Sequence, residues 1–207
     1  MALNDQSTRI RDGEELDAAI IDSYLKAHIP GLSGEPQISQ FPGGASNLTY
    51  LLEYPQQEFV LRRPPFGHKA KSAHDMGREY RILNQLNAGF PYCPKAYVHC
   101  TDESVIGSEF YVMERVNGII LRADLPAELN FSPEQTTQLC KSFIDKLVEL
   151  HNVDYQACGL GDLGKPEGYV ARQISGWSDR YEKALTPDAP LWTEVKAWLN
   201  EKMPADH

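Results

Sequence analysis

The chain has 207 residues and a formal net charge of −9. A typical domain has about 100 to 200 residues, so this length allows one domain or two small lobes. The acidic balance argues against a general nucleic-acid binder, because phosphate backbones select for an excess of Lys and Arg.

The first half of the chain is predicted to hold a leading helix and short strands. Asp12 with Glu15 three residues later forms a capping-box pattern, and apolar residues then recur at helical spacing until Pro30. Alternating stretches separated by Gly- and Pro-containing turns follow, and they predict an antiparallel three-strand meander. These stretches are residues 37–41, 49–53 and 59–63.

A second helix and two more strands are predicted before residue 118. Ser72 and Asp75 form a helix cap, and the helix that it opens runs to about residue 87, where Gly89 is placed to terminate it. The two further strands are predicted at residues 95–101 and 109–114.

Beyond Gly118 the pattern becomes helical. The segment Ser132-Pro133-Glu134-Gln135 is a strong helix start, and spaced aromatic and aliphatic residues predict two more helices over 168–185 and 190–203. We therefore expect an α+β chain of two lobes, with a strand-rich lobe at 1–117 and a helical lobe at 118–207. A cleft between lobes is where ligands usually bind.

The cysteines and the amino terminus indicate a cytoplasmic protein. The four cysteines are widely spaced and lack the C-x-x-C pattern of a zinc site or redox pair, so they are interpreted as reduced thiols. The amino terminus has no apolar signal-peptide core, and no run approaches the ~18 apolar residues that a membrane span needs.

Glu79 is the strongest physical clue to a site. Helical spacing places it within the apolar arc that contains Leu83 and Leu86. A carboxylate on that arc needs a cation, and Arg62 on the preceding strand is the best candidate. A strand cation paired with a helix carboxylate is the kinase arrangement for holding nucleotide phosphates. The alternative interpretation is a surface Glu with a solvated Arg.

Two loops are further candidates for nucleotide binding. In the turn FPGGASN, Gly43 and Gly44 permit close approach of the backbone to a phosphate, and Ser46 supplies a hydroxyl beside Asn47. A hairpin with Gly-Gly is more often only a turn.

The stretch FYVMERVNG is the second of these loops. It leads from a strand into the predicted link between lobes. There the Glu114 carbonyl and the Val116 N–H could bond an adenine edge beside Met113. On spacing alone, an edge strand followed by a turn is the commoner interpretation.

These features in this order resemble the aminoglycoside phosphotransferase and choline kinase-like superfamily. The closest likeness is to the kinase-like domain found alone in bacteria or fused to acyl-CoA dehydrogenases. The matching stretches include FPGGASNLTYLL, FVLRRPP, SAHDMGREYRIL, FYVMERVNG and GLGDLGKPEGYVARQISGWSDRY. The resemblance covers most of residues 37–199. It implies a protein-kinase-like two-lobe fold, ATP and Mg²⁺, and a small hydroxyl-bearing acceptor, for which a hydroxyacyl-CoA is one candidate.

The resemblance also implies roles for particular residues. Arg62 stands where the kinase strand-three lysine usually sits, and Glu79 matches the helix-C glutamate. Glu114 and Val116 match the hinge, and Ser46 lies over the phosphates. Because a guanidinium fork is not equivalent to a compact ammonium, Arg at position 62 puts the phosphate geometry in doubt.

The superfamily's catalytic motif is missing from these 207 residues. Phosphoryl transfer there needs an Asp in a form such as H-G-D-x-x-x-x-N, followed by a second Asp for magnesium. Asp154 follows His151, but Gly159 stands where the Asn should be. We therefore expect a C-terminally truncated chain with an incomplete helical lobe, no catalytic or metal-binding residues and no turnover. The alternatives are a non-catalytic nucleotide-binding or interaction module and a helical lobe completed by a separate polypeptide.

Two more features carry weaker expectations. The locally basic stretch at 62–81 could attract ATP or another phosphorylated ligand, but a solvated loop explains it equally well. Trp177 is expected to pack in a core rather than line an acceptor site. Some apolar surface of the helical half is expected to be exposed.

Overall fold

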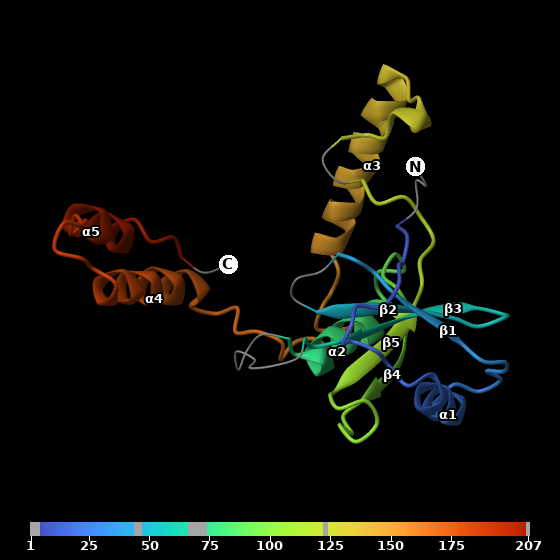
Figure 1. The fold of residues 1–207 in the computed structure, drawn as a ribbon. Coiled ribbons are helices and arrows are strands. Elements are labelled where there is room, and N and C mark those ends of the chain that lie inside the picture. Colours follow the sequence, from blue (N-terminus) through green and yellow to red (C-terminus); the bar gives the residue numbers. More distant parts are fainter. Residues whose placement is uncertain (1–4, 44–46, 66–73, 122–123, 206–207) are drawn as a thin grey trace. The chain divides into compact units, whose positions relative to one another are not determined.

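The computed structural model describes residues 5–43, 47–65, 74–121 and 124–205 (Figure 1). The chain divides into two compact units, which we call the sheet unit (Met1–Leu160) and the two-helix unit (Gly161–His207). Each unit is described by itself. The predicted lobe boundary at residues 117 and 118 stays a prediction.

The sheet unit contains a five-stranded antiparallel sheet of order β1-β2-β3-β5-β4 (Figure 1). The strands are β1 (Gln37–Gln40), β2 (Leu48–Glu53), β3 (Glu58–Arg63), β4 (Ala96–Cys100) and β5 (Phe110–Glu114). The predicted three-strand meander is confirmed, because β1 pairs with β2 and β2 with β3. Together with the helices, the sheet confirms the α+β fold class.

Successive side chains of a strand point to opposite sides, so the sheet has two different faces. One face carries the main hydrophobic core, in which Leu61 of β3 and Val112 of β5 pack with Leu25 of α1 (Ala18–His28). The other face carries a small cluster that includes Val60 and Met113. Residues that follow one another along β3 or along β5 therefore lie on opposite faces of the sheet.

The predicted start of the leading helix is wrong. The helix begins at Ala18, where the Asp17 side chain accepts hydrogen bonds from the N–H groups of Ala19 and Ile20. The capping-box pair predicted five residues earlier is used differently, because Glu15 accepts from the N–H of Gly13 within a turn. The end of the helix before Pro30 is confirmed.

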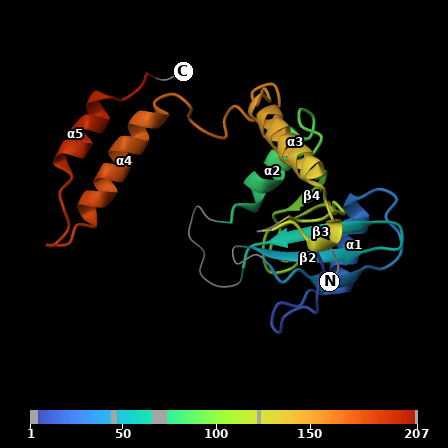
Figure 2. The same ribbon diagram turned by 90° about the horizontal axis from the view of Figure 1, so that it is seen from above.

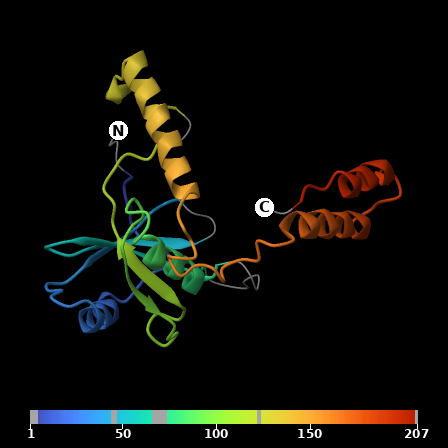
Figure 3. The same cartoon turned by 180° about the vertical axis from the view of Figure 1, so that it is seen from behind.

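Helix α2 (Met76–Leu86) lies against β4 and β5 (Figure 3). Asp75 caps it by accepting a hydrogen bond of 2.8 Å from the N–H of Arg78, as predicted, whereas Ser72 lies outside the described residues. The ring of Tyr80 stacks on His99 of β4 at 5.3 Å. These contacts fix which face of α2 the sheet meets.

Helix α3 (Pro133–His151) begins where the sequence predicted. Ser132 and Gln135 form the reciprocal hydrogen bonds of a capping box. A short 3₁₀ turn, η1 (Ala127–Leu129), precedes it and was not predicted. Across the ranges that the structure describes, no helix is both long and apolar enough to cross a membrane.

The two-helix unit consists of α4 (Tyr169–Lys183) and α5 (Thr193–Glu201), which lie side by side (Figure 2). The prediction that Trp177 packs in a core is wrong, because its side chain is 62% exposed. Two helices cover only one stripe of each other, so the remaining apolar faces lie outside the contact between α4 and α5. The expected exposure of apolar surface is confirmed here.

Candidate functional site

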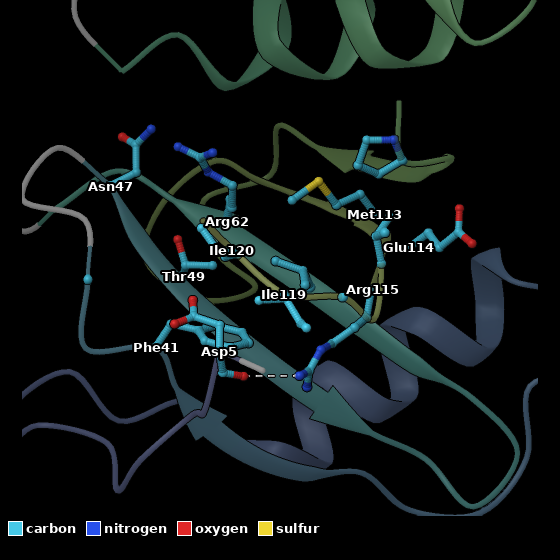
Figure 4. A pocket seen from close by; sticks show the side chains of 15 residues that line it. Asp5, Phe41, Asn47, Thr49, Arg62, Met113, Glu114, Arg115, Ile119 and Ile120 are labelled. Carbon is cyan, nitrogen blue, oxygen red and sulfur yellow. Dashed lines mark hydrogen bonds between the residues drawn. The ribbon is translucent and has the colours of Figure 1, made fainter. Parts of the chain in front are cut away.

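A pocket of about 630 Å³ lies on the face of the sheet opposite α1 (Figure 4). It is bordered by strands β2, β3 and β5 and by the chain that follows β5. The residues that line it are Asp5, Phe41, Gly43, Asn47, Thr49, Val60, Arg62, Pro94, Met113, Glu114, Arg115, Val116, Gly118, Ile119 and Ile120.

The lining of the pocket changes from apolar to polar. Val60 and Met113 pack together with Phe41 on the sheet, and two isoleucines after β5 add to this apolar part. Arg62 and Asn47 lie beside each other at another edge of the pocket (Figure 4). Such a pocket can accommodate a ligand with a flat apolar part and an anionic part.

Arg62 and Glu79 come together as the sequence predicted. Arg62 Nε lies 3.6 Å from Glu79 Oε2, and each side chain is 32% exposed. Glu79 sits in the first turn of α2, and Arg62 is near the end of β3. The pair is partly buried rather than enclosed, so the interpretation as a fully solvated surface pair does not describe it.

Two neutral side chains bind the same carboxylate, and only one of them was a candidate. The Asn47 amide donates to Glu79 Oε1 at 3.0 Å, and the Tyr111 hydroxyl donates to Glu79 Oε2 at 2.9 Å. The other side of the Asn47 amide bonds His74 Nδ1 at 2.9 Å, and His74 has a φ of 66°. Asn47 thus contacts Glu79 directly, in addition to lining the pocket.

Tyr111 was missed by the sequence analysis. The signal was present, since Tyr111 follows Phe110 on β5 and must face the side opposite the core residue. Burial raises the pKa of the Tyr111 hydroxyl well above its ordinary value. The positive charge of Arg62 acts against this rise, and the negative charge of Glu79 adds to it.

Arg62 has an unsatisfied donor. Its Nε is buried and has no hydrogen-bond partner among the described residues. A buried donor without a partner costs about 1 to 3 kcal/mol, so a native structure that keeps one usually has a reason. Because Nε is buried, a ligand in the pocket cannot reach that atom, and an anion would instead contact the exposed third of the Arg62 side chain, which lines the pocket.

The link after β5 supplies Met113, Glu114 and Val116, all of which line the pocket. Glu114 is fixed to the segment before β4, because its N–H donates to the Lys95 carbonyl at 2.8 Å and its carboxylate accepts from the Lys95 N–H at 3.2 Å. The link is therefore held in place at its first residue.

Arg115 was also missed, and it connects two segments that line the pocket with the start of β3. Its guanidinium donates to the Asp5 carbonyl at 3.2 Å and lies 3.7 Å from the Glu58 carboxylate. It also lies over the Phe41 ring at 5.4 Å. No local pattern marked it, because its partners come from distant segments.

The glycine-rich turn lies only partly within the described residues. Gly43 lines the pocket, and a Cβ added there would meet no atom of the described chain within 4 Å. Gly44 and Ser46 lie outside the described residues, so their predicted roles over the phosphates stay predictions.

No group of three or more His, Cys, Asp or Glu side chains in the described ranges could hold a metal ion. The Glu79 carboxylate already accepts from two neutral donors and faces Arg62. It therefore does not fit the role of a metal ligand here.

Comparison with known proteins gives consistent matches. Residues 37–207 match the phosphotransferase enzyme family. The chain is 35% identical to acyl-CoA dehydrogenase family member 11 of Gallus gallus over 212 residues, which cover 100% of this chain and 27% of that protein. It is 34% identical to acyl-CoA dehydrogenase family member 10 of Mus musculus, covering 90% of this chain and 18% of the relative. The chain thus spans about a quarter or less of these curated relatives.

A solved structure matches as well. The fold resembles a crystal structure described as an aminoglycoside phosphotransferase from Ralstonia eutropha, with a TM-score of 0.76 and 34% identity. The match covers 93% of this chain and 56% of that one. The resemblance inferred from the sequence motifs is confirmed, and so is the kinase-like fold.

Proposed function

Because the chain belongs to the phosphotransferase enzyme family, we propose that its sheet unit binds the nucleotide of an ATP-dependent small-molecule kinase. The observation that carries this proposal is the pocket in which Arg62, held near Glu79, lies at a polar edge, while another part of the lining is apolar. A nucleotide has the matching chemistry, with an aromatic base and an anionic triphosphate.

In this proposal the base lies against Phe41, Val60 and Met113, and the phosphates extend toward Arg62. The adenine edge bonds the Glu114 carbonyl and the Val116 N–H. Gly43, Gly44 and Ser46 approach the phosphates from the turn between β1 and β2. The Glu79 carboxylate keeps Arg62 at the phosphate end, since it lies only 3.6 Å away.

The reaction proposed for the complete protein is transfer of the γ-phosphoryl group to a hydroxyl. The acceptor oxygen forms a bond to phosphorus, the bond from phosphorus to the ADP oxygen breaks, and the hydroxyl proton passes to a base. We propose a hydroxyacyl-CoA as acceptor, because the relatives are named acyl-CoA dehydrogenase family members. Mg²⁺ would neutralise the transferred phosphate when bound.

These 207 residues do not contain the H-G-D-x-x-x-x-N motif that would supply the base. We therefore propose that they bind ATP without turnover when separated from the rest of the enzyme. The alternative is a non-catalytic nucleotide-binding or interaction module, which shares the binding step but never acts in transfer. A cytoplasmic location stays a prediction.

The binding site is tested by calorimetric titration with ATP. Arg62→Ala should weaken ATP binding about 10- to 100-fold, since it removes charge-assisted hydrogen bonds to the phosphates. Arg180→Ala is the matched control, because Arg180 stacks on Trp177 in the two-helix unit, and it should bind as wild type does. If the wild type and both variants bind ATP with equal affinity, or if the wild type does not bind ATP, the proposed binding site is wrong.

The absence of turnover is tested with the same protein. Incubation with Mg·ATP and a hydroxyacyl-CoA should release no ADP above background. A normal kinase rate from these 207 residues would overturn that part of the proposal. The alternative is favoured if ATP binds but no acceptor is phosphorylated by any longer protein that contains this chain.

A further inference from the structure

We infer that Tyr111 is a positioning residue of this site. Its hydroxyl donates a hydrogen bond to Glu79 Oε2, the oxygen that faces Arg62, and so keeps the guanidinium available to a phosphate. The inference rests on the proposed function, because it assigns a role within the same nucleotide site. Tyr111 itself does not line the pocket and acts through Glu79.

The distances show which donor holds the shared oxygen. Glu79 Oε2 lies 2.9 Å from the Tyr111 hydroxyl and 3.6 Å from Arg62 Nε. The first distance is that of a hydrogen bond, and the second is too long for one. The other oxygen, Oε1, accepts from Asn47 at 3.0 Å. Each carboxylate oxygen therefore has a neutral donor.

This arrangement matters because the cation is an arginine. A guanidinium and a carboxylate readily close into a bidentate pair, in which two parallel N–H groups face the two oxygens. Such a pair would direct the donors of Arg62 to Glu79 and away from a ligand. With both oxygens occupied, the carboxylate attracts Arg62 by charge, while the exposed part of the Arg62 side chain continues to line the pocket.

The fold holds the Tyr111 ring in place for this role. Tyr111 is buried and lies opposite Arg62 in the β3–β5 register. Burial raises the pKa of its hydroxyl, so the group stays protonated and can donate throughout the neutral range. Because Arg62 and Tyr111 are paired across one ladder, the donor and the cation reach the same oxygen from adjacent strands.

The test separates binding of the phosphates from binding of the base. Tyr111→Phe removes the hydroxyl and leaves the ring, so Arg62 should close onto Glu79. We expect ATP affinity to fall about three- to tenfold, with adenosine affinity unchanged. Tyr54→Phe is the matched control, because its buried hydroxyl donates to the Asp22 carboxylate at 3.1 Å outside the pocket. It should bind both ligands as wild type does.

A double-mutant cycle tests whether Tyr111 acts through Glu79. In a Glu79→Gln background, Tyr111→Phe should change ATP affinity by less than about twofold. An unaltered effect in that background would overturn the inference. So would equal losses of ATP and adenosine, which indicate a general structural role, or wild-type ATP affinity in Tyr111→Phe.

The two failures can be told apart. If the wild type binds ATP but Tyr111→Phe binds it equally well, only the role of Tyr111 fails. If the wild type binds no ATP, the proposed function fails, and the inference that rests on it falls with it.

Discussion

The antiparallel sheet of the sheet unit buries aromatic rings against α1, whereas the two-helix unit leaves its tryptophans exposed. Phe59 and Phe110 are completely buried between the sheet and α1, while Trp177, Trp192 and Trp198 are each more than half exposed. A sheet with a helix packed on it encloses a core, but two helices alone can cover only one side of each other. The comparison teaches that one unit is stabilised by its own core, and that the other has much apolar surface outside the contact between its helices.

The same difference appears where the helices begin. The sheet-unit helices have side-chain caps at Asp17, Asp75 and Ser132. In the two-helix unit, α4 follows Gly168 and α5 follows Trp192, each with left-handed backbone and no side-chain cap. Local capping signals therefore favour the helices of the sheet unit, whereas packing favours α1 and α2 but not α3, which has no buried residue.

The largest expected effect is the loss of a core ring. Phe59→Ala should lower the free energy of unfolding of the sheet unit by about 3 to 5 kcal/mol. The ring is fully buried and packs edge-to-face with the rings of Tyr54 and Tyr97, whose centroids lie 5.8 and 5.1 Å from its own. Urea unfolding followed by near-ultraviolet circular dichroism measures it. Trp177→Ala is the control and should lower the free energy of unfolding by at most about 1 kcal/mol. If both substitutions lower it equally, the contrast between the buried and the exposed rings is wrong.

Alkaline pH should weaken the sheet unit, and each buried tyrosine should contribute an intermediate amount. Burial raises the pKa of Tyr50 to about 12 and also raises those of Tyr54 and Tyr111. The folded state then keeps protons that the unfolded state loses from about pH 10 upward, so the free energy of unfolding falls as pH rises. The loss due to Tyr50 alone should be of the order of 1 to 3 kcal/mol by about pH 12, and the other two hydroxyls add to it.

Denaturant titrations at several alkaline pH values measure how the free energy of unfolding depends on pH. Tyr50→Phe should make the dependence shallower, since one of the shifted groups is gone. A free energy of unfolding that does not change above about pH 10 would show that these hydroxyls do not titrate differently on folding.

The smallest expected effect concerns the start of α5. Trp192 has a φ of 49°, a conformation that asparagine tolerates better than a bulky residue. Trp192→Asn should therefore raise the stability of the two-helix unit by about 0.5 kcal/mol. Fluorescence of the two remaining tryptophans during unfolding measures the change. A loss of more than about 1 kcal/mol would mean that the packing of the ring outweighs the backbone strain.

Much of the fold could be predicted because its signals are local. The strands β1 to β5 follow alternation within a few residues, and α2 and α3 follow their caps. The start of α1 failed because two acidic patterns compete within residues 12–17, and only one of them caps a helix.

The candidate site was predictable in part for the same reason. Arg62 and Glu79 stand out because each has an unusual charge for its position on a strand or a helix. Tyr111 and Arg115 do not, since their roles depend on partners that lie far away in sequence. Tyr111 meets Arg62 only through the pairing of β3 with β5, which no local pattern specifies.

Strand β3 has a consequence for how this site can change over evolution. Phe59 and Leu61 belong to the core, while Val60 and Arg62 belong to the pocket. Substitutions can therefore alter one face and leave the other intact. A single-residue insertion or deletion would exchange the faces, sending the charge into the core and an apolar side chain into the pocket. We expect natural variation along β3 to occur by replacement at constant length.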